Sequence, residues 1–438
     1  MNSVSQRGHS AITTLSVARY VKPRGAFVLL GILLVLTLMM LANNGIFNIS
    51  GTFSDEHDHF KRSMMFSAIV RGNLSLEAIG TFYSGGIWPP FYPMLIGGFQ
   101  AATHADVGAL RIINVLLAYA GFALLIAAVA AAWVRYAIVG IAGLFSLGTH
   151  YYYQIRPENL IILLLAALIY LVVKRGLFSA IAPAPRGRLY ALGGTLCALS
   201  CLTHAFLAIV AVYLLVLGLM VIRQRMWFII AFVAIAGPYV IAQKLIHNGV
   251  VLFATTAEEN LARNNNVFLR NNERPKADDL LFDEMERRYK AGDKEVYPRP
   301  LVLPQTRYEQ WLHDENKRRI FKEMAISEVS ADPAGAAIRA LGRATALVSG
   351  EGCIVGQRYG CNVSPGIDRF AFYGLELLAL VGLLCAAKNE RWYSASFSFV
   401  FACFAMLTPM IATQAVERQF IIVLLLAAFG GLARLRPL

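Results

Sequence analysis

The segment AFVLLGILLVLTLMMLA, residues 26–42, is apolar throughout except for a single threonine. A helix needs roughly 17–25 such residues to cross the hydrocarbon core of a bilayer. The basic residues Arg19, Lys22 and Arg24 precede the segment, as they would in a signal peptide. No small-residue cleavage motif follows it, however, and further apolar runs come later in the chain. The segment therefore predicts an uncleaved membrane span.

The rest of the 438-residue chain has the same character, since 57% of its residues are hydrophobic and only 15% are charged. Soluble domains rarely have this composition. It predicts an all-α polytopic membrane protein with about ten transmembrane helices. A shorter apolar run at 91–103 follows two prolines and predicts an interfacial or re-entrant helix. The ten spans are placed at 26–42, 112–133, 136–150, 158–173, 189–204, 205–222, 226–245, 369–387, 392–413 and 419–433.

The charge distribution predicts the orientation of these spans. With the N-terminus inside, the short cytoplasmic pieces hold 15 of the 40 basic residues and one of the 27 acidic residues. The remaining pieces are close to neutral, so the net charge of +13 lies almost entirely on one side. This is the positive-inside pattern of membrane proteins. The basic composition therefore reports orientation, and no nucleic-acid partner is expected.

The layout divides the chain into three predicted parts. Residues 1–245 form a transmembrane module whose first outer loop, 43–111, is expected to contain interfacial helices. Residues 246–367 form an extracytoplasmic soluble segment with 17 basic and 17 acidic residues. Its sequence predicts a small, mainly helical domain, with helices over 278–291 and 308–330 and a third after Pro333. Residues 368–438 form the C-terminal transmembrane helices.

The first outer loop opens with SDEHDHFKRS, residues 54–63, which is dense in titratable side chains. Ser54 is a candidate N-cap, so Asp55 is expected at the start of a helix. Such acids also suit the positive end of a helix dipole without any further function. His57 and His59 are weak candidates for metal ligands, because they diverge on a helix and no third ligand is evident. Hydrogen-bonding histidines are the favoured interpretation, and no metal or other cofactor is expected.

The six cysteines fall into two groups. Four lie in predicted spans, where cysteine packs as a small apolar residue. Cys353 and Cys361 lie in the extracytoplasmic segment, in GEGCIVGQRYGCNV. An oxidising compartment favours a disulfide between them.

At this point the chain resembles the GT-C glycosyltransferases of the protein-mannosyltransferase and lipid A aminoarabinose-transferase type (families 39 and 83). The resemblance rests on short motifs in a fixed order. His204 departs from the pattern, because the family commonly has lysine or arginine after Leu-Thr. The motifs are DE at 55–56, WPPFYPMLIGGF at 88–99, LRIINVLLAY at 110–119, HYYYQIRPENLIILLL at 150–165, GPYVIAQKLIHNGVVLFATTAEENLARNNN at 237–266 and ERQFIIVLLL at 417–426.

The resemblance implies an inverting transfer of a sugar from a polyprenyl-phosphate carrier to an envelope lipid, glycan or protein. The reaction would occur on the outer face of a bacterial inner membrane. Asp55, Glu56 and Glu158 are the implied catalytic residues. The residues implied in binding the donor or its phosphate are Arg111, Arg156, Lys244, Arg418, Asn260 and Arg263.

Two other function classes remain open on the sequence. A transporter or flippase of lipid-linked sugars would be expected to show paired repeats, broken helices and charges near the middle of the membrane. A glycan ligase or polymerase would be expected to have an outer loop rich in arginine and histidine, without an acidic pair after the first span. Consumption of a polyprenyl-phosphate sugar by the purified protein would distinguish the transferase from both.

Overall fold

The computed structural model describes residues 23–52, 55–84, 89–129, 132–148, 152–175, 177, 187–204, 225–247, 257–270, 274–300, 303 and 305–348. Within these residues every regular element is a helix, so the all-α prediction is confirmed for this part of the chain. Four predicted spans, 205–222, 369–387, 392–413 and 419–433, lie outside the described residues. Cys353, Cys361 and Arg418 also lie outside them, so the disulfide stays a prediction.

Three described helices are long and apolar enough to cross a membrane. They are α1 (Arg24–Asn43), α5 (Val107–Ala128) and α10 (Arg225–Ile246), the last of these over Met226–Ile246. Two shorter apolar stretches, Ala132–Gly143 and Glu158–Leu171, belong to α6 (Ala132–Gly148) and α7 (Glu158–Arg175). A further helix, α8 (Gly187–Cys201), occupies most of the fifth predicted span. The count of ten spans therefore stays a prediction.

Helix α5 begins five residues before the span predicted at 112–133. Its N-cap is Asp106, whose Oδ1 accepts a hydrogen bond from the amide of Ala109 at 2.8 Å. Capping by a short acidic side chain is a strong helix-start signal. The correction matters because Arg111, expected in the loop before the span, lies inside the first turns of α5.

The apolar helices approach one another closely at glycines. A Cβ on Gly121 of α5 would lie 3.0 Å from the amide nitrogen of Leu163 in α7. A Cβ on Gly194 of α8 would lie 2.1 Å from the carbonyl oxygen of Phe228 in α10. Small residues at helix crossings are typical of membrane bundles, where packing replaces the hydrophobic drive. The apolar side chains of α1, such as Val35 and Met39, are largely exposed, as expected for a surface that faces lipid.

Three shorter helices follow α1 and carry most of the candidate site. They are α2 (Asp55–Val70), α3 (Leu76–Ser84) and α4 (Phe91–Thr103), and a 3₁₀ turn, η1 (Ile46–Asn48), precedes them. Helix α4 has the bounds predicted from the apolar run. Helices α2 and α4 cross at Gly97, where a Cβ would lie 2.3 Å from the carbonyl oxygen of Ser63. A larger residue at Gly97 would push α2 away from α4.

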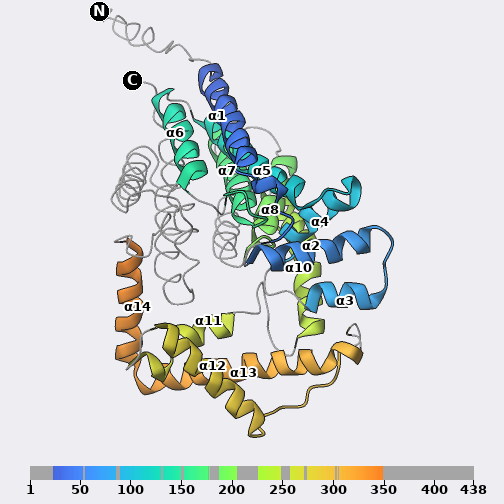
Figure 1. Ribbon diagram of the computed structural model, residues 1–438, viewed down its shortest axis with the longest axis vertical. Coiled ribbons are helices and arrows are strands. Elements are labelled where there is room, and N and C mark those ends of the chain that lie inside the picture. Colours follow the sequence, from blue (N-terminus) through green and yellow to red (C-terminus); the bar gives the residue numbers. More distant parts are fainter. Residues whose placement is uncertain are drawn as a thin grey trace, which may run out of the picture.

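The polar helical segment, residues 257–348, forms a separate small core. Its helices are α11 (Ala257–Asn264), α12 (Arg274–Lys290), α13 (Tyr308–Ala331) and α14 (Pro333–Val348), with 3₁₀ turns η3 (Val267–Arg270) and η4 (Gln305–Arg307). The helices predicted over 278–291, over 308–330 and after Pro333 are thereby confirmed. Figure 1 shows α12 and α13 at the opposite end of the molecule from α1. The buried side chains between these helices include Leu281, Met285, Ile320 and Phe321.

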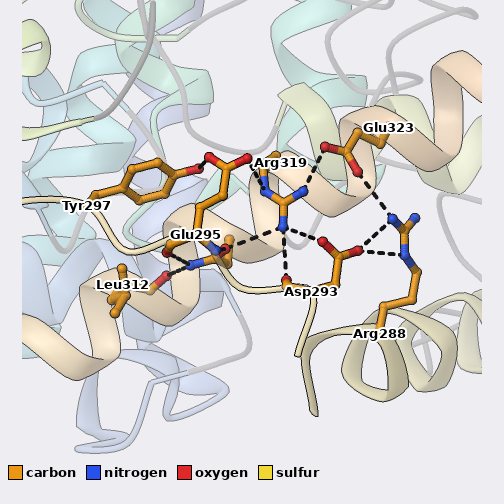
Figure 2. A network of polar contacts seen from close by, with 8 residues as sticks. Arg288, Asp293, Glu295, Tyr297, Leu312, Arg319 and Glu323 are labelled. Carbon is orange, nitrogen blue, oxygen red and sulfur yellow. Dashed lines mark hydrogen bonds and ion pairs between the residues drawn. The ribbon is translucent and has the colours of Figure 1, made fainter. Parts of the chain in front are cut away.

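Ion pairs link α12, the following loop and α13 on the surface of this segment (Figure 2). Arg319 donates to Asp293 at 2.7 Å and to Glu323 at 2.8 Å. Arg288 donates to the same two carboxylates, at 2.6 Å and 3.2 Å. The two arginines and two carboxylates therefore form a closed, partly exposed network, which we call the surface network.

The end of α10 is fastened to the first half of α13. The indole Nε1 of Trp311 donates to the carbonyl oxygen of Ile246 at 3.0 Å. The Nδ1 of His247 lies 2.6 Å from the Oε1 of Glu315, and both side chains are buried. Arg318 donates to Glu315 as well, at 3.0 Å. This junction fixes the polar helical segment against the last turn of a candidate membrane span.

Candidate active site

Helix α2 buries its polar face and exposes apolar side chains. Glu56, His59 and Arg62 recur at helical spacing and are all at most 5% exposed. Met64 and Val70, by contrast, are 36% and 53% exposed. In the second half of α2 apolar side chains are thus exposed beside a buried polar face, which fits lipid on one side and a polar site on the other. The first half of α2 also exposes titratable side chains. Asp58, the residue before His59, is exposed.

The centre of the buried face is an ion pair between Glu56 and Arg111. Arg111 donates through Nε to Oε1 and through Nη2 to Oε2, both at 3.0 Å, and both side chains are completely buried. The other donors of Arg111 reach backbone carbonyl oxygens of Ile46, Ile49 and Gly51, at 3.0, 2.7 and 2.6 Å. All five N–H groups of the guanidinium are therefore engaged by this chain. In this conformation Arg111 holds Glu56 and the loop before α2, and its predicted contact with a donor phosphate stays a prediction.

Glu56 also fixes the chain in front of α7. Its Oε1 accepts a hydrogen bond from the amide of Ile155 at 2.9 Å. The next residue, Arg156, is buried, and so is Glu158, which begins α7. An acid in the first turn also suits the helix dipole. The Glu56 carboxylate therefore holds the segment that carries Arg156 and Glu158, two further predicted site residues, close to the start of α2.

Hydrogen bonds of one tyrosine and two asparagines join α4, α5 and α7 beside this pair. The hydroxyl of Tyr92 in α4 donates to Asn114 of α5 at 2.9 Å. Asn114 donates to the carbonyl oxygen of Gln154. Asn159 of α7 donates in turn to the carbonyl oxygens of Asn114 and Tyr152, at 2.8 and 2.6 Å. Bonded polar side chains of this kind fix helix positions inside an apolar bundle.

Basic side chains gather around His59. Burial holds the pKa of His59 well below its usual range, and the positive charges of Arg156 and Arg62 lower it further. His204, which follows α8, lowers it as well. His59 also contacts Tyr92 edge-on, with ring centroids 5.5 Å apart. His59 is therefore neutral at pH 7, within a buried region of positive potential.

Arg62 connects this region to α3. Its Nε donates to the carbonyl oxygen of Phe82 at 3.2 Å, and its guanidinium lies 5.0 Å from the centre of the Phe82 ring. Burial lowers the pKa of Arg62 to about 10, so the side chain stays charged at pH 7. Together with Glu56 and Arg111, these residues form what we call the buried polar cluster: Glu56, His59, Arg62, Tyr92, Arg111, Asn114, Arg156, Glu158, Asn159 and His204.

The remaining predicted site residues lie elsewhere or carry less information. Asp55 begins α2, as predicted, but its side chain is not among those described. Lys244 is exposed on α10. Asn260 and Arg263 lie on α11 in the polar helical segment, where Arg263 pairs with Asp278 at 3.4 Å. Their predicted contacts with the donor stay predictions.

The two histidines of α2 lie in different surroundings. His57 is exposed and lies 3.0 Å from the hydroxyl of Thr52, whereas His59 is buried. Among the described residues, no group of three or more histidine, cysteine or acidic side chains is placed to hold a metal ion. Cys197 and Cys201 are buried free thiols within this part of the chain.

Five members of the cluster were not among the predicted site residues: Arg62, Tyr92, Asn114, Asn159 and His204. The signal for Arg62 was its helical spacing from Glu56 and His59, once the polar face is taken as the buried one. Comparison with protein-family models, with curated proteins and with solved structures finds no match for this chain. The geometry alone therefore defines the site as a buried cluster of acids, cations and amides beside three candidate membrane helices.

Proposed function

We propose that this protein is a GT-C-type glycosyltransferase of a bacterial inner membrane. It transfers a sugar from a polyprenyl-phosphate carrier to an envelope lipid, glycan or protein on the outer face. The observation that carries the proposal is the buried polar face of α2, which directly follows a membrane helix and holds Glu56 in a bidentate pair with Arg111. The order of motifs in the sequence supports the same reaction class.

Asp55 is the proposed general base. It removes the proton from the acceptor hydroxyl or amine while that atom attacks the anomeric carbon, and the attack from the face opposite the phosphate inverts the configuration. Glu56 is the next residue on α2, and its carboxylate is fixed by Arg111 and by the amide of Ile155. These contacts anchor the first turn of α2, so Asp55 has a defined backbone position from which to act.

The positive region around His59 is the proposed environment for the departing carrier phosphate. Developing negative charge on a leaving group is stabilised most strongly by cations in a dry, preorganised site. Arg62 and Arg156 are both buried, and both act electrostatically on His59. The exposed apolar side chains of α2 fit contact with lipid at the same level, where the prenyl chain would lie.

The test is donor consumption by the full-length protein in lipid nanodiscs. A polyprenyl-phosphate sugar is supplied with envelope lipid and glycan fractions, and released carrier phosphate and glycosylated product are measured by mass spectrometry. Asp55→Asn keeps the size of the side chain but cannot accept the proton, so turnover should fall by about 10²–10⁴. Asp58→Asn is the matched control, since Asp58 is exposed on the same helix, and it should turn over like the wild type.

The outcomes separate the function classes. If the wild type and Asp55→Asn release carrier phosphate at the same rate, the protein is still a transferase, but Asp55 is not its general base. Movement of an unchanged lipid-linked sugar across the bilayer, with no product, would indicate a transporter and overturn the proposal.

A further inference from the structure

Gln243 of α10 is a buried amide to which the described part of the chain supplies no hydrogen bond. Its side chain is 1% exposed, and among the residues that the structure describes neither its Oε1 nor its Nε2 has a hydrogen-bond partner. A buried polar group without a partner lowers the folding equilibrium constant by a factor on the order of ten or more. Native proteins therefore keep few such groups, and each one calls for an explanation such as a bound ligand.

The position of Gln243 points to a ligand. Residues four apart share a helix face, so Tyr239, Gln243 and His247 form one stripe along α10. The ring of Tyr239 lies 6.1 Å from the ring of Tyr83 in α3, and Tyr83 is only partly buried. Arg62 of the buried polar cluster acts electrostatically on both tyrosines. The unsatisfied amide therefore lies one helical turn from Tyr239, whose ring neighbours Tyr83 and interacts with the buried cation Arg62.

The junction at the other end of the stripe holds this face in place. His247 contacts Glu315, and the carbonyl oxygen of Ile246 accepts a hydrogen bond from Trp311. These bonds restrict movement of the last turn of α10, so reorienting the helix to expose Gln243 to water would require breaking them. A hydroxyl-bearing ligand would satisfy the amide by entering beside this fixed face, to which water has no access in the unliganded conformation.

We propose that Gln243, with the rings of Tyr83 and Tyr239, forms the subsite for the sugar of the lipid-linked donor. An amide offers donors and an acceptor to adjacent sugar hydroxyls, and tyrosine combines an apolar ring with a polar end. Arg62 supplies positive charge between this subsite and the region assigned to the phosphate. The assignment rests on the proposed function, because it takes the ligand to be a sugar on a phosphate-bearing lipid.

The decisive variant is Gln243→Leu, which keeps the approximate shape and removes the amide. Replacing an unsatisfied buried amide with an apolar group should leave the thermal midpoint unchanged or raise it. Any loss of binding then cannot be attributed to misfolding. Gln100→Leu is the matched control, because the amide oxygen of buried Gln100 already accepts a hydrogen bond from Ser67. That control should lower the thermal midpoint and leave the sugar preference unchanged.

The experiment measures binding of two kinds of probe to the full-length protein in nanodiscs. The first is undecaprenyl phosphate alone, and the second is the same lipid carrying glucose, mannose or 4-amino-arabinose. We expect the wild type to bind one sugar-bearing lipid about tenfold more tightly than the bare carrier, as two added hydrogen bonds would give. Gln243→Leu should bind the bare carrier like the wild type and lose that preference.

Two results would overturn the subsite. One is a sugar preference that survives in Gln243→Leu, and the other is a wild type that binds the bare carrier without preferring any sugar-bearing form. Failure of the wild type to bind every probe, the bare carrier included, would instead overturn the proposed function on which the subsite rests. Binding of the bare carrier therefore separates the two failures.

Discussion

The buried polar cluster and the surface network use the same side chains in opposite surroundings. In the cluster, Glu56 and Arg111 are completely buried, and every N–H of the arginine is engaged. In the surface network, Arg319 and Asp293 are 19% and 30% exposed and lie 2.7 Å apart. The distances are similar, yet water screens the second pair and not the first. The strength of these ion pairs therefore follows from their burial and not from the distance between their atoms.

The difference has a functional side. A buried charge pair costs free energy to desolvate, so an apolar core without it is often as stable. The cluster places several such charges beside three candidate membrane helices, where burying them is expensive. The partly exposed surface network carries a smaller cost of this kind and needs no function beyond holding α12, its loop and α13 together. The contrast supports placing the chemistry at the cluster.

The largest expected effect is that of Arg111→Ala. Removing one partner of a buried pair leaves the other charged and unpaired, which typically costs about 3–5 kcal/mol. The carbonyl oxygens of Ile46, Ile49 and Gly51 also lose their donor. The measurement is the free energy of unfolding in detergent micelles under increasing denaturant. Arg111→Lys should recover only part of the loss, because lysine cannot reproduce the bidentate fork.

The control for this comparison is Arg287→Ala. Arg287 pairs with Glu284 at 2.6 Å, a distance shorter than those of the buried pair, but its side chain is 68% exposed. We expect no measurable change in stability. Equal losses in Arg111→Ala and Arg287→Ala would break the comparison, because burial would then not decide the strength of the pair.

An intermediate effect is expected at the junction of α10 and α13. Glu315 is 4% exposed and contacts both His247 and Arg318. Glu315→Gln keeps the shape but removes the charge, so stability should fall by about 1–3 kcal/mol. Glu309→Gln on the exposed side of the same helix is the matched control. Hydrogen exchange at the last turn of α10 should quicken in the first variant only; unchanged exchange there would show that the junction does not hold the helix.

The sequence predicted the elements better than their connections. Apolar runs located α1, α4, α7 and α10 to within two residues, because each begins at a charged residue or directly after a proline. The start of α5 was missed because Asp106 looks like an ordinary loop acid until its capping bond to Ala109 is seen. The motif order pointed to Glu56, Arg111, Arg156 and Glu158 as site residues, and the structure brings all four into one cluster.

What the sequence could not supply was the pairing. The contact between Glu56 and Arg111 joins residues 55 positions apart, and that between Glu56 and Ile155 joins residues 99 positions apart. No local pattern encodes such contacts. Gln243 is a further case, since a glutamine near a span end reads as an ordinary interfacial residue. What distinguishes it is its burial, with neither amide atom hydrogen-bonded within the described part of the chain.

The smallest expected effect is that of Asp293→Asn in the surface network. Hydrogen bonds from Arg319, and then from Arg288, hold the pKa of Asp293 below its usual value of 3.8. A carboxyl whose pKa is depressed in the folded state stabilises the protein above its unfolded pKa, and it loses this contribution as the pH falls through the folded value. At pH 7 we therefore expect Asp293→Asn to cost under about 1 kcal/mol, because the pair is partly exposed and screened. At an acid pH below that folded value the wild type is protonated as well, so the difference between the two proteins should vanish. The check is the free energy of unfolding of both proteins at the two pH values. Asp279→Asn is the control, because Asp279 is exposed and its replacement should leave stability unchanged at either pH. A cost at pH 7 as large as that of Arg111→Ala would show that the network behaves like a buried pair, and the contrast between the two regions would then fail.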